Sequence, residues 1–226
     1  MRPIDKRIAP KQYKSYRKYR DDLAKQIGWY CSYCEMPVKN MIEVEHVVPV
    51  KNGGNELDWN NFLLSCKYCN TVKSNRNTSR KGYFWPDTDN TFLAFSYSQA
   101  KIIEPNNQLT PAKMAIAQDT IDLMGLNRYP GATNKPTEGD TRWRSKDEVW
   151  GEALRSLERW QKLPNNQQIL ELITALAKGT GHFSIWMEVF KNEIAVKQAF
   201  IKEFTGTAKN CFINGNPVSR RGGKNL

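Results

Sequence analysis

Two pairs of cysteines constrain the fold of this chain more than any other feature of its sequence. The pairs are Cys31-Ser-Tyr-Cys34 and Cys66-Lys-Tyr-Cys69, with 31 residues between them. Each pair forms a tight knuckle whose two thiolates cover half of the coordination sphere of a tetrahedral zinc ion. The sequence therefore predicts a structural Zn²⁺ site with the ligands Cys31, Cys34, Cys66 and Cys69.

Disulfide bonds are the alternative use of these cysteines. The chain begins without an apolar signal segment and has five cysteines, an odd number, which favours a reducing compartment and zinc. We expect the fifth, Cys211, to be a buried thiol and not a ligand. A closed site of four sulfurs leaves no position for water or substrate, so any catalysis must use other residues on the same scaffold.

A second motif lies between and just after the cysteine pairs. It contains Glu45-His46-Val-Val-Pro49, then Asn61, and then Asn70 directly after Cys69. Fourteen residues separate His46 from Asn61, and eight separate Asn61 from Asn70. A neutral imidazole can take a proton from water at cellular pH, so His46 is a candidate general base.

These spacings resemble those of the HNH endonucleases, with Asn at the third motif position of this chain. The resemblance covers about residues 28–80. It implies a ββα-metal unit, with Glu45 and Asn70 as ligands of a catalytic divalent cation, Mg²⁺ or Mn²⁺. It also implies that Asn61 ties down the loop that orients His46. Asn60 is a rival for that role, but both motif intervals select Asn61.

The geometry of a strand sets a condition on this site. Adjacent strand residues point to opposite faces, so Glu45 and His46 can face one cation only at a bulge or at the end of a strand. The sequence predicts a strand over residues 41–50, a turn at 51–54, and a helix from Thr71 that is opened by Asn70. The start of that helix would favour a bound phosphate.

The rest of the chain is predicted to be mainly helical, which gives an α+β class overall. Helices are expected at residues 10–27, 110–125, 143–163, 165–178 and 183–204. His182 precedes the last of these and is expected to be a cap or packing residue. We expect a nuclease domain at 1–126, a linker or long loop at 127–141, a helical domain for docking a partner at 142–218, and a disordered tail at 219–226.

The charge distribution favours a polyanionic partner. The net charge is +11, and residues 1–86 contain 16 Lys and Arg against eight Asp and Glu. Clustered cations bind phosphates by releasing counterions, although a charge run is often only a solvated helix face. The expected nucleic-acid contacts form an N-terminal cluster of Lys11, Lys14, Arg17, Lys18 and Arg20, and a second cluster of Lys73, Arg76, Arg80 and Lys81.

Three functions remain open from these residues. The first is an endonuclease acting on DNA, the second is the same site acting on RNA, and the third is a zinc-dependent nucleic-acid-binding module without turnover. The third treats Glu45-His46 as a solvated surface pair. We favour catalysis because the chain has only two histidines and one of them falls on the motif.

Three phrases add a wider resemblance. They are Met1-Arg-Pro-Ile-Asp-Lys6, Tyr30-Cys-Ser-Tyr-Cys-Glu-Met36 and Trp85-Pro-Asp-Thr-Asp-Asn-Thr-Phe92. They are similar to the PtuB family, the HNH nuclease subunits of bacterial Septu anti-phage systems that also occur as retron effectors. The similarity implies a bacterial cytoplasmic protein and an ABC-type ATPase partner of the PtuA kind. The chain has no Walker motif, so nucleotide switching would come from that partner.

Overall fold

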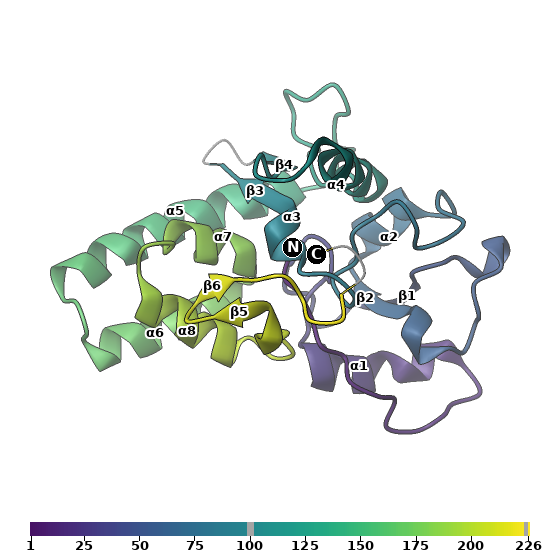
Figure 1. Ribbon diagram of the computed structural model, residues 1–226, viewed down its shortest axis with the longest axis horizontal. Helices are drawn as coiled ribbons and strands as arrows, with labels where there is room; N and C mark the ends of the chain where they lie inside the picture. The colour runs from purple at the N-terminus through teal and green to yellow at the C-terminus, as the bar shows by residue number, and fades with distance from the viewer. Residues whose placement is uncertain (99–101, 224–225) are drawn as a thin grey trace.

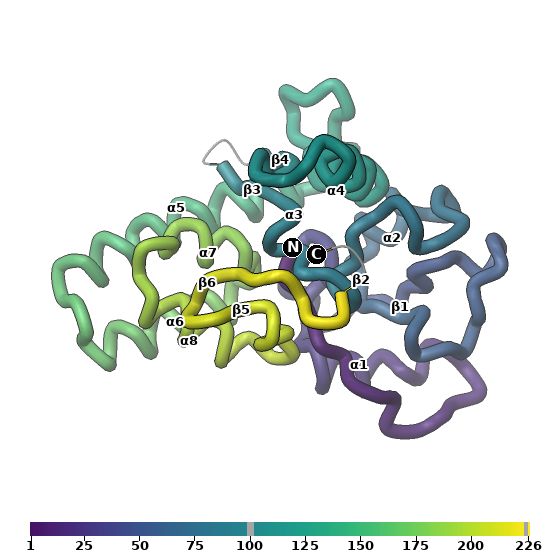
Figure 2. Tube along the Cα trace, in the orientation of Figure 1, coloured from purple at the N-terminus to yellow at the C-terminus, as the bar shows by residue number. Residues whose placement is uncertain are grey.

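The computed structural model describes residues 1–98, 102–223 and 226 of the chain. Its fold is α+β, with short two-stranded sheets and a helical region at the C-terminal end of the chain (Figure 1). The motif-bearing strands lie at one end of the molecule and the C-terminal helices at the other, and both chain termini lie between them (Figures 1 and 2). Within the described residues, no helix combines the length and the apolar character needed to cross a lipid bilayer.

The motif residues lie on a strand–strand–helix unit. Strand β1 (Glu43–His46) pairs antiparallel with β2 (Phe62–Ser65), and His46 lies opposite Phe62 in the register. Helix α2 (Lys67–Lys73) follows β2. The strand is shorter than the predicted residues 41–50, because Val50–Asn52 form a 3-10 turn and Gly53 adopts a left-handed φ of 89°.

Helix α2 corrects one prediction about the site. It begins at Lys67 and not at Thr71, because the Cys66 sulfur accepts a hydrogen bond from the backbone N–H of Cys69 and caps the helix. Asn70 therefore lies inside the helix and does not open it. The free N–H groups of the first turn lie beside the cysteines, so the expected phosphate site at the helix start is wrong.

The N-terminal helix is also shorter than predicted. A 3-10 turn, η1 (Tyr16–Tyr19), leads into α1 (Arg20–Ile27), which ends at Gly28 as expected. Residues 10–15 are not helical. In this segment Tyr13 folds back on the helix: its backbone N–H donates to the Tyr19 hydroxyl at 3.1 Å and its own hydroxyl donates to Asp22 at 2.8 Å.

The middle of the chain packs on the motif-bearing unit. Helix α3 (Thr91–Ala94) leads into β3 (Phe95–Tyr97), which pairs antiparallel with β4 (Ile103–Pro105). Helix α4 (Pro111–Met124) is capped by the Thr110 hydroxyl and ends at Gly125 in a left-handed conformation, as its sequence predicts.

The C-terminal region contains α5 (Arg142–Lys162), α6 (Gln167–Thr180), α7 (Phe183–Val189) and α8 (Ile194–Glu203). The predicted helix at 183–204 is two helices. The chain turns back between them because Phe190 packs on Phe200, with ring centroids 5.6 Å apart, and both rings are fully buried. A 3-10 turn (Lys209–Cys211) and the short strands β5 (Phe212–Ile213) and β6 (Asn216–Pro217) follow.

The apolar core has two parts. One buried cluster contains residues from 1 to 126 together with Leu226, and the other contains residues from 149 to 212. The domain boundaries themselves stay a prediction. Residues 219–226 were expected to be a disordered tail, of which 224–225 lie outside the described residues. Arg220 donates to the backbone oxygens of Ile4 and Pro86 at 3.0 and 3.1 Å. The structure therefore differs from that expectation at Arg220.

Polar contacts join the two parts beside the first cysteine pair. Glu35 follows Cys34, and its carboxylate accepts hydrogen bonds from the backbone N–H of Ser184 at 3.0 Å and from the Ser184 hydroxyl at 2.7 Å. The backbone oxygen of Glu35 also accepts from the N–H of His182 at 3.0 Å. The helical region is thus bonded directly to the segment that carries the cysteines.

Candidate active site and zinc centre

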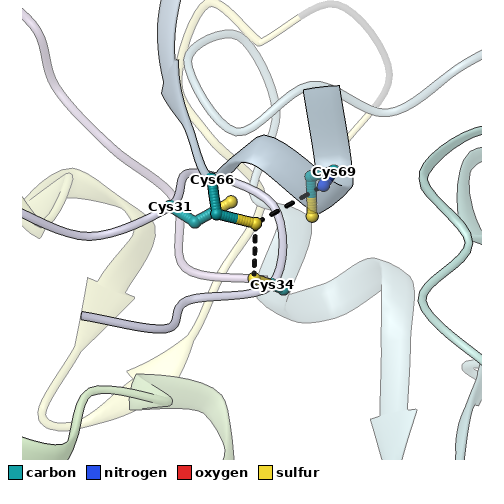
Figure 3. A group of neighbouring side chains, drawn as sticks. All are labelled: Cys31, Cys34, Cys66 and Cys69. Atoms are coloured by element: carbon teal, nitrogen blue, oxygen red, sulfur yellow. Dashed lines mark hydrogen bonds between the residues drawn. The ribbon is translucent and has the colours of Figure 1, made fainter. Parts of the chain in front are cut away.

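The four predicted zinc ligands come together in the structure. The sulfurs of Cys31, Cys34, Cys66 and Cys69 all lie within 4.8 Å of one another, and all four residues are buried (Figure 3). The Cys34 and Cys66 sulfurs are 3.7 Å apart. Two thiolates on a tetrahedral zinc ion with bonds of about 2.3 Å lie about 3.8 Å apart. The cluster therefore fits a structural zinc ion, with two ligands from the knuckle after α1 and two from the start of α2.

Two cations from α5 approach this cluster. Arg142 donates from Nη1 to the Cys69 sulfur at 3.1 Å and to the backbone oxygen of Met124 at 3.0 Å, while Asp140 pairs with the same guanidinium at 2.7 Å. Lys146 is buried nearby and donates to the backbone oxygen of Leu126. Four thiolates around Zn²⁺ carry a net negative charge, which these cations offset.

His46 is the last residue of β1, so the strand-end condition on the site is met. Its ring packs against Phe62 at 5.2 Å and against Tyr16 at 4.7 Å between centroids. Its Nε2 atom lies 3.0 Å from the backbone oxygen of Glu56. A carbonyl oxygen can only accept a hydrogen bond, so this contact assigns the proton of neutral His46 to Nε2. Nδ1 then holds the lone pair that can take a proton from water.

Asn61 braces the chain that leaves His46. Its side-chain oxygen accepts from the N–H of Val48 at 2.8 Å, and its amide nitrogen donates to the oxygens of Val48 and Asn55 at 2.9 and 3.1 Å. The Asn61 backbone oxygen accepts from the N–H of Val47 at 2.8 Å. These bonds hold both ends of the loop after β1, which is the position expected of the supporting asparagine. Asn60 is exposed and makes none of these bonds.

Glu45 is buried and held by two partners. Lys73 lies 2.5 Å from one carboxylate oxygen, and the Tyr33 hydroxyl donates to the other. Lys73 also donates to the backbone oxygen of His46 at 2.9 Å. One buried ammonium group thus fixes α2 to both residues of the Glu45-His46 step. Burial, together with the Glu45 charge, raises the pKa of Tyr33 well above its usual value, so Tyr33 remains a donor.

Asn70 reaches the site from the middle of α2. Its amide nitrogen donates to the carboxylate of Glu43 at 2.7 Å. That hydrogen bond turns the amide nitrogen toward Glu43 and leaves the Asn70 oxygen as the atom able to bind a cation. Glu45 and Asn70 line one cavity and supply carboxylate and amide oxygens, which suit a hard divalent cation. Their role as cation ligands stays a prediction.

Two adjoining cavities surround these residues. The first has a volume of about 440 Å³ and is lined by Glu45, His46, Glu56, Asn70 and, among others, Lys51. The second has a volume of about 360 Å³, and its lining includes Arg17, Arg20 and Glu43. Both are lined by Tyr16, Val44 and Asn70. The catalytic candidates therefore face an open depression that continues toward two arginines.

The N-terminal basic cluster is exposed as predicted. Lys11, Lys14, Arg17, Lys18 and Arg20 all lie at the surface, and Arg17 and Arg20 line the second cavity. Lys11 is placed over the ring of Tyr13, at 4.9 Å from its centre. This cluster leaves cationic groups accessible beside the catalytic candidates.

The second basic cluster corrects a prediction. Lys73 is 1% exposed and bonded to Glu45, so it cannot be a surface contact for nucleic acid. Arg80 makes two bonds to Asp87, at 2.8 and 2.9 Å, and is also turned inward. Arg76 donates to the backbone oxygens of Asp122 and Leu123. Lys81 is exposed, and its contact with nucleic acid stays a prediction.

Cys211 and His182, which were not expected to belong to the site, are both buried. Cys211 lies outside the four-cysteine cluster, and burial raises the pKa of its thiol to about 11. His182 precedes α7 as expected, and its Nε2 lies 2.9 Å from the Ser145 hydroxyl. Burial lowers the pKa of His182 to about 4, against the opposing effect of Glu35, so this ring is neutral at cellular pH.

Several residues of the site were not predicted from the sequence. Glu43, Tyr33 and Glu56 contact the motif side chains, and Tyr16 packs on His46. Glu43 could have been predicted from the sequence, because residues two apart on a strand share a face and Glu45 was already a candidate. Tyr33 lies inside the first cysteine pair, whereas Glu56 and Tyr16 belong to none of the motifs.

The comparison with known proteins agrees with this geometry. Residues 31–76 match the family model described as HNH endonuclease, a span that contains the four cysteines and all the motif residues. This span is therefore the part of the chain that is similar to the HNH endonucleases. A search of curated proteins found no match to the chain.

Proposed function

We propose that this protein is a metal-dependent endonuclease that hydrolyses phosphodiester bonds of DNA. The observation that carries the proposal is the placement of His46, whose Nε2 is held by Glu56 in a cavity shared with Glu45 and Asn70. In the proposed reaction Nδ1 of His46 takes a proton from water, and the resulting hydroxide attacks phosphorus. Lys73 holds the backbone oxygen of His46, and Asn61 holds the chain that follows it.

Glu45 and Asn70 would hold the catalytic cation, Mg²⁺ or Mn²⁺. When bound, the cation supplies charge neutralisation at the scissile phosphate and stabilises the departing oxygen. Arg17 and Arg20 would bind phosphates of the same strand beyond the cleaved bond, since they line the adjoining cavity.

Cleavage assays test this function directly. Plasmid DNA and total RNA are incubated with the wild-type protein and with His46→Ala, each with Mg²⁺, Mn²⁺ or EDTA. We expect metal-dependent cutting of DNA by the wild type and a loss of about 10²- to 10⁴-fold in the variant. Cutting of RNA but not of DNA would make RNA the substrate in place of DNA. Retained DNA binding without cutting by the wild type would favour the zinc-dependent binding module.

The wider biological role that we propose is the nuclease effector of a bacterial anti-phage complex of the PtuB type. Its partner would be a PtuA-like ABC-type ATPase that docks on the helical region. The support is the similarity of the three sequence phrases and the apolar exposure of Leu172 on α6, which is 66% exposed.

Truncation of the helical region would also remove the bonds that Arg142 and Ser184 make to the cysteine-bearing segments. Point variants therefore test this docking better than truncation. Leu172→Glu is expected to weaken co-purification with a co-expressed PtuA-like ATPase while leaving the isolated fold intact. Ile8→Glu is the matched control, since Ile8 is 86% exposed in the N-terminal part. An unchanged complex with Leu172→Glu would move the interface away from α6.

A further inference from the structure

Tyr16 contacts the candidate base from outside the strand–strand–helix unit. It opens the 3-10 turn η1, and its ring centroid lies 4.7 Å from that of His46 with the ring planes at 61°. Phe62 makes a second edge contact with the same imidazole at 5.2 Å and 76°. The His46 ring is thus packed against one aromatic ring from its own sheet and one from the N-terminal segment.

The contact with Tyr16 restrains the orientation of the His46 ring. The torsion that turns an imidazole about its Cβ–Cγ bond has broad minima, so hydrogen bonds and packing must select one orientation. The bond that selects it here is made to the backbone oxygen of Glu56, an exposed residue of the loop after β1. A single bond to an exposed loop is a weak restraint, whereas an aromatic wall blocks rotation by steric overlap.

Tyr16 also contacts Arg17, which follows it in the chain. Arg17 donates from Nε to the Tyr16 hydroxyl at 3.4 Å, and its guanidinium lies 5.7 Å from the centre of the Tyr16 ring. Tyr16 lines both cavities beside β1, so its ring forms part of the boundary between the catalytic cavity and the cavity with the arginines. The phenol therefore lies on the side where a nucleic-acid strand would enter.

We propose that Tyr16 is a positioning residue for His46. Its ring keeps Nε2 of the imidazole on the Glu56 oxygen and so keeps Nδ1 available as the base. This proposal rests on the function proposed above, in which His46 takes a proton from water. The role of Tyr16 is carried by its ring and not by its hydroxyl, because the contact with His46 is made between the two rings.

Nitrogen-15 NMR of the imidazoles tests the positioning without any substrate. The chain has only two histidines, so a His182→Asn variant leaves His46 as the one imidazole and assigns its signals. We expect the wild type and Tyr16→Phe to show His46 mainly in the form protonated at Nε2. Tyr16→Ala is expected to show averaged signals of both neutral forms.

Tyr13→Ala is the matched control for loss of a ring from the same segment. Tyr13 packs on Tyr19, with centroids 4.9 Å apart, and lines neither cavity. It is expected to leave the His46 signals unchanged. If Tyr16→Ala does not fold, Tyr16→Leu replaces it, since leucine fills part of the space without an aromatic wall.

Single-turnover and steady-state cleavage give the second measurement. Tyr16→Ala is expected to lower kcat by about 10- to 100-fold, as a misplaced catalytic group does, with little change in KM. Tyr16→Phe is expected to restore most of the rate. Arg17→Ala is expected to raise KM instead, because it removes a phosphate contact. In a His46→Ala background, Tyr16→Ala should cause no further loss.

The outcomes separate this inference from the proposed function. A Tyr16→Ala protein with wild-type imidazole signals and wild-type kcat would overturn the positioning role, and a change in KM alone would make Tyr16 a substrate contact instead. Absence of cleavage by the wild type would refute the nuclease proposal. The NMR comparison would then still decide whether Tyr16 orients the His46 ring.

Discussion

The four-cysteine cluster and the cavity beside His46 share consecutive residues of one helix yet differ in burial and in openness. Cys69 and Asn70 are neighbours on α2, and because successive helical residues project about 100° apart, one faces the cysteine cluster and the other the cavity. The four cysteines are at most 5% exposed, and cations from α5 approach them. His46 and Asn70 are only half-buried and face open space. One short helix thus carries residues of a closed cysteine cluster and of an open cavity.

Removal of zinc is expected to have the largest effect on stability. Structural zinc sites contribute about 10 kcal/mol or more of folding free energy, which is comparable to the whole stability of a domain. Cys66→Ser or a strong chelator should therefore unfold the strand–strand–helix unit, as measured by circular dichroism with zinc quantified by mass spectrometry. The matched control is Cys211→Ser, which should retain zinc. A folded, zinc-free Cys66→Ser protein would contradict the structural role of the centre.

The buried ion pair between Lys73 and Glu45 is expected to have the next largest effect on stability. Removal of one partner of a buried pair leaves an uncompensated charge and costs about 3–5 kcal/mol. Lys73→Met should therefore lower the free energy of unfolding in urea by that amount, because it strands Glu45. Lys67→Met on the exposed side of α2 is the control and should change stability little. Equal stabilities of the two variants would show that the pair does not brace the site.

The buried His182 is expected to make stability depend on pH. Burial lowers the pKa of His182 from the usual 6.5 to about 4, so its stabilising contribution is complete above pH 6.5 and is lost as the pH falls through 4. The loss amounts to about 3 kcal/mol.

His182→Asn removes this titration and suits the left-handed φ of 53° at that position. The difference in unfolding free energy between wild type and variant, measured at pH 7 and at pH 4, should shrink by about that amount. An unchanged difference would mean that His182 titrates normally.

The smallest effect concerns the surface cations beside the cavity. Arg17→Ala should weaken DNA binding a few-fold and reduce the slope of log affinity against log salt by about 1, since one phosphate contact is lost. Lys81→Ala is the control. Lys81 belongs to the second basic cluster, is exposed and lines neither cavity. Fluorescence anisotropy at several salt concentrations measures both. A larger effect of Lys81→Ala would place the nucleic acid on the other side of the site.

The sequence by itself determined the features that depend on spacing along the chain. Two Cys-x-x-Cys pairs predicted the sulfur cluster that the structure contains, because each knuckle is a local structure. The resemblance carried by the His46, Asn61 and Asn70 intervals implied the strand–strand–helix unit, and the helix expected at residues 110–125 is α4. The lengths of elements were less predictable: β1 and α1 are shorter than expected and α2 begins earlier, since loop hydrogen bonds compete with the local preference.

Only the tertiary structure decided which charges are accessible and what surrounds the catalytic candidates. Lys73 and Arg17 are both basic residues in positively charged stretches, yet one is buried against Glu45 and the other lines a cavity. Tyr16 precedes His46 by 30 residues and still packs on its ring. The physical reason is that burial and pairing are set by contacts between distant segments, which no local spacing encodes.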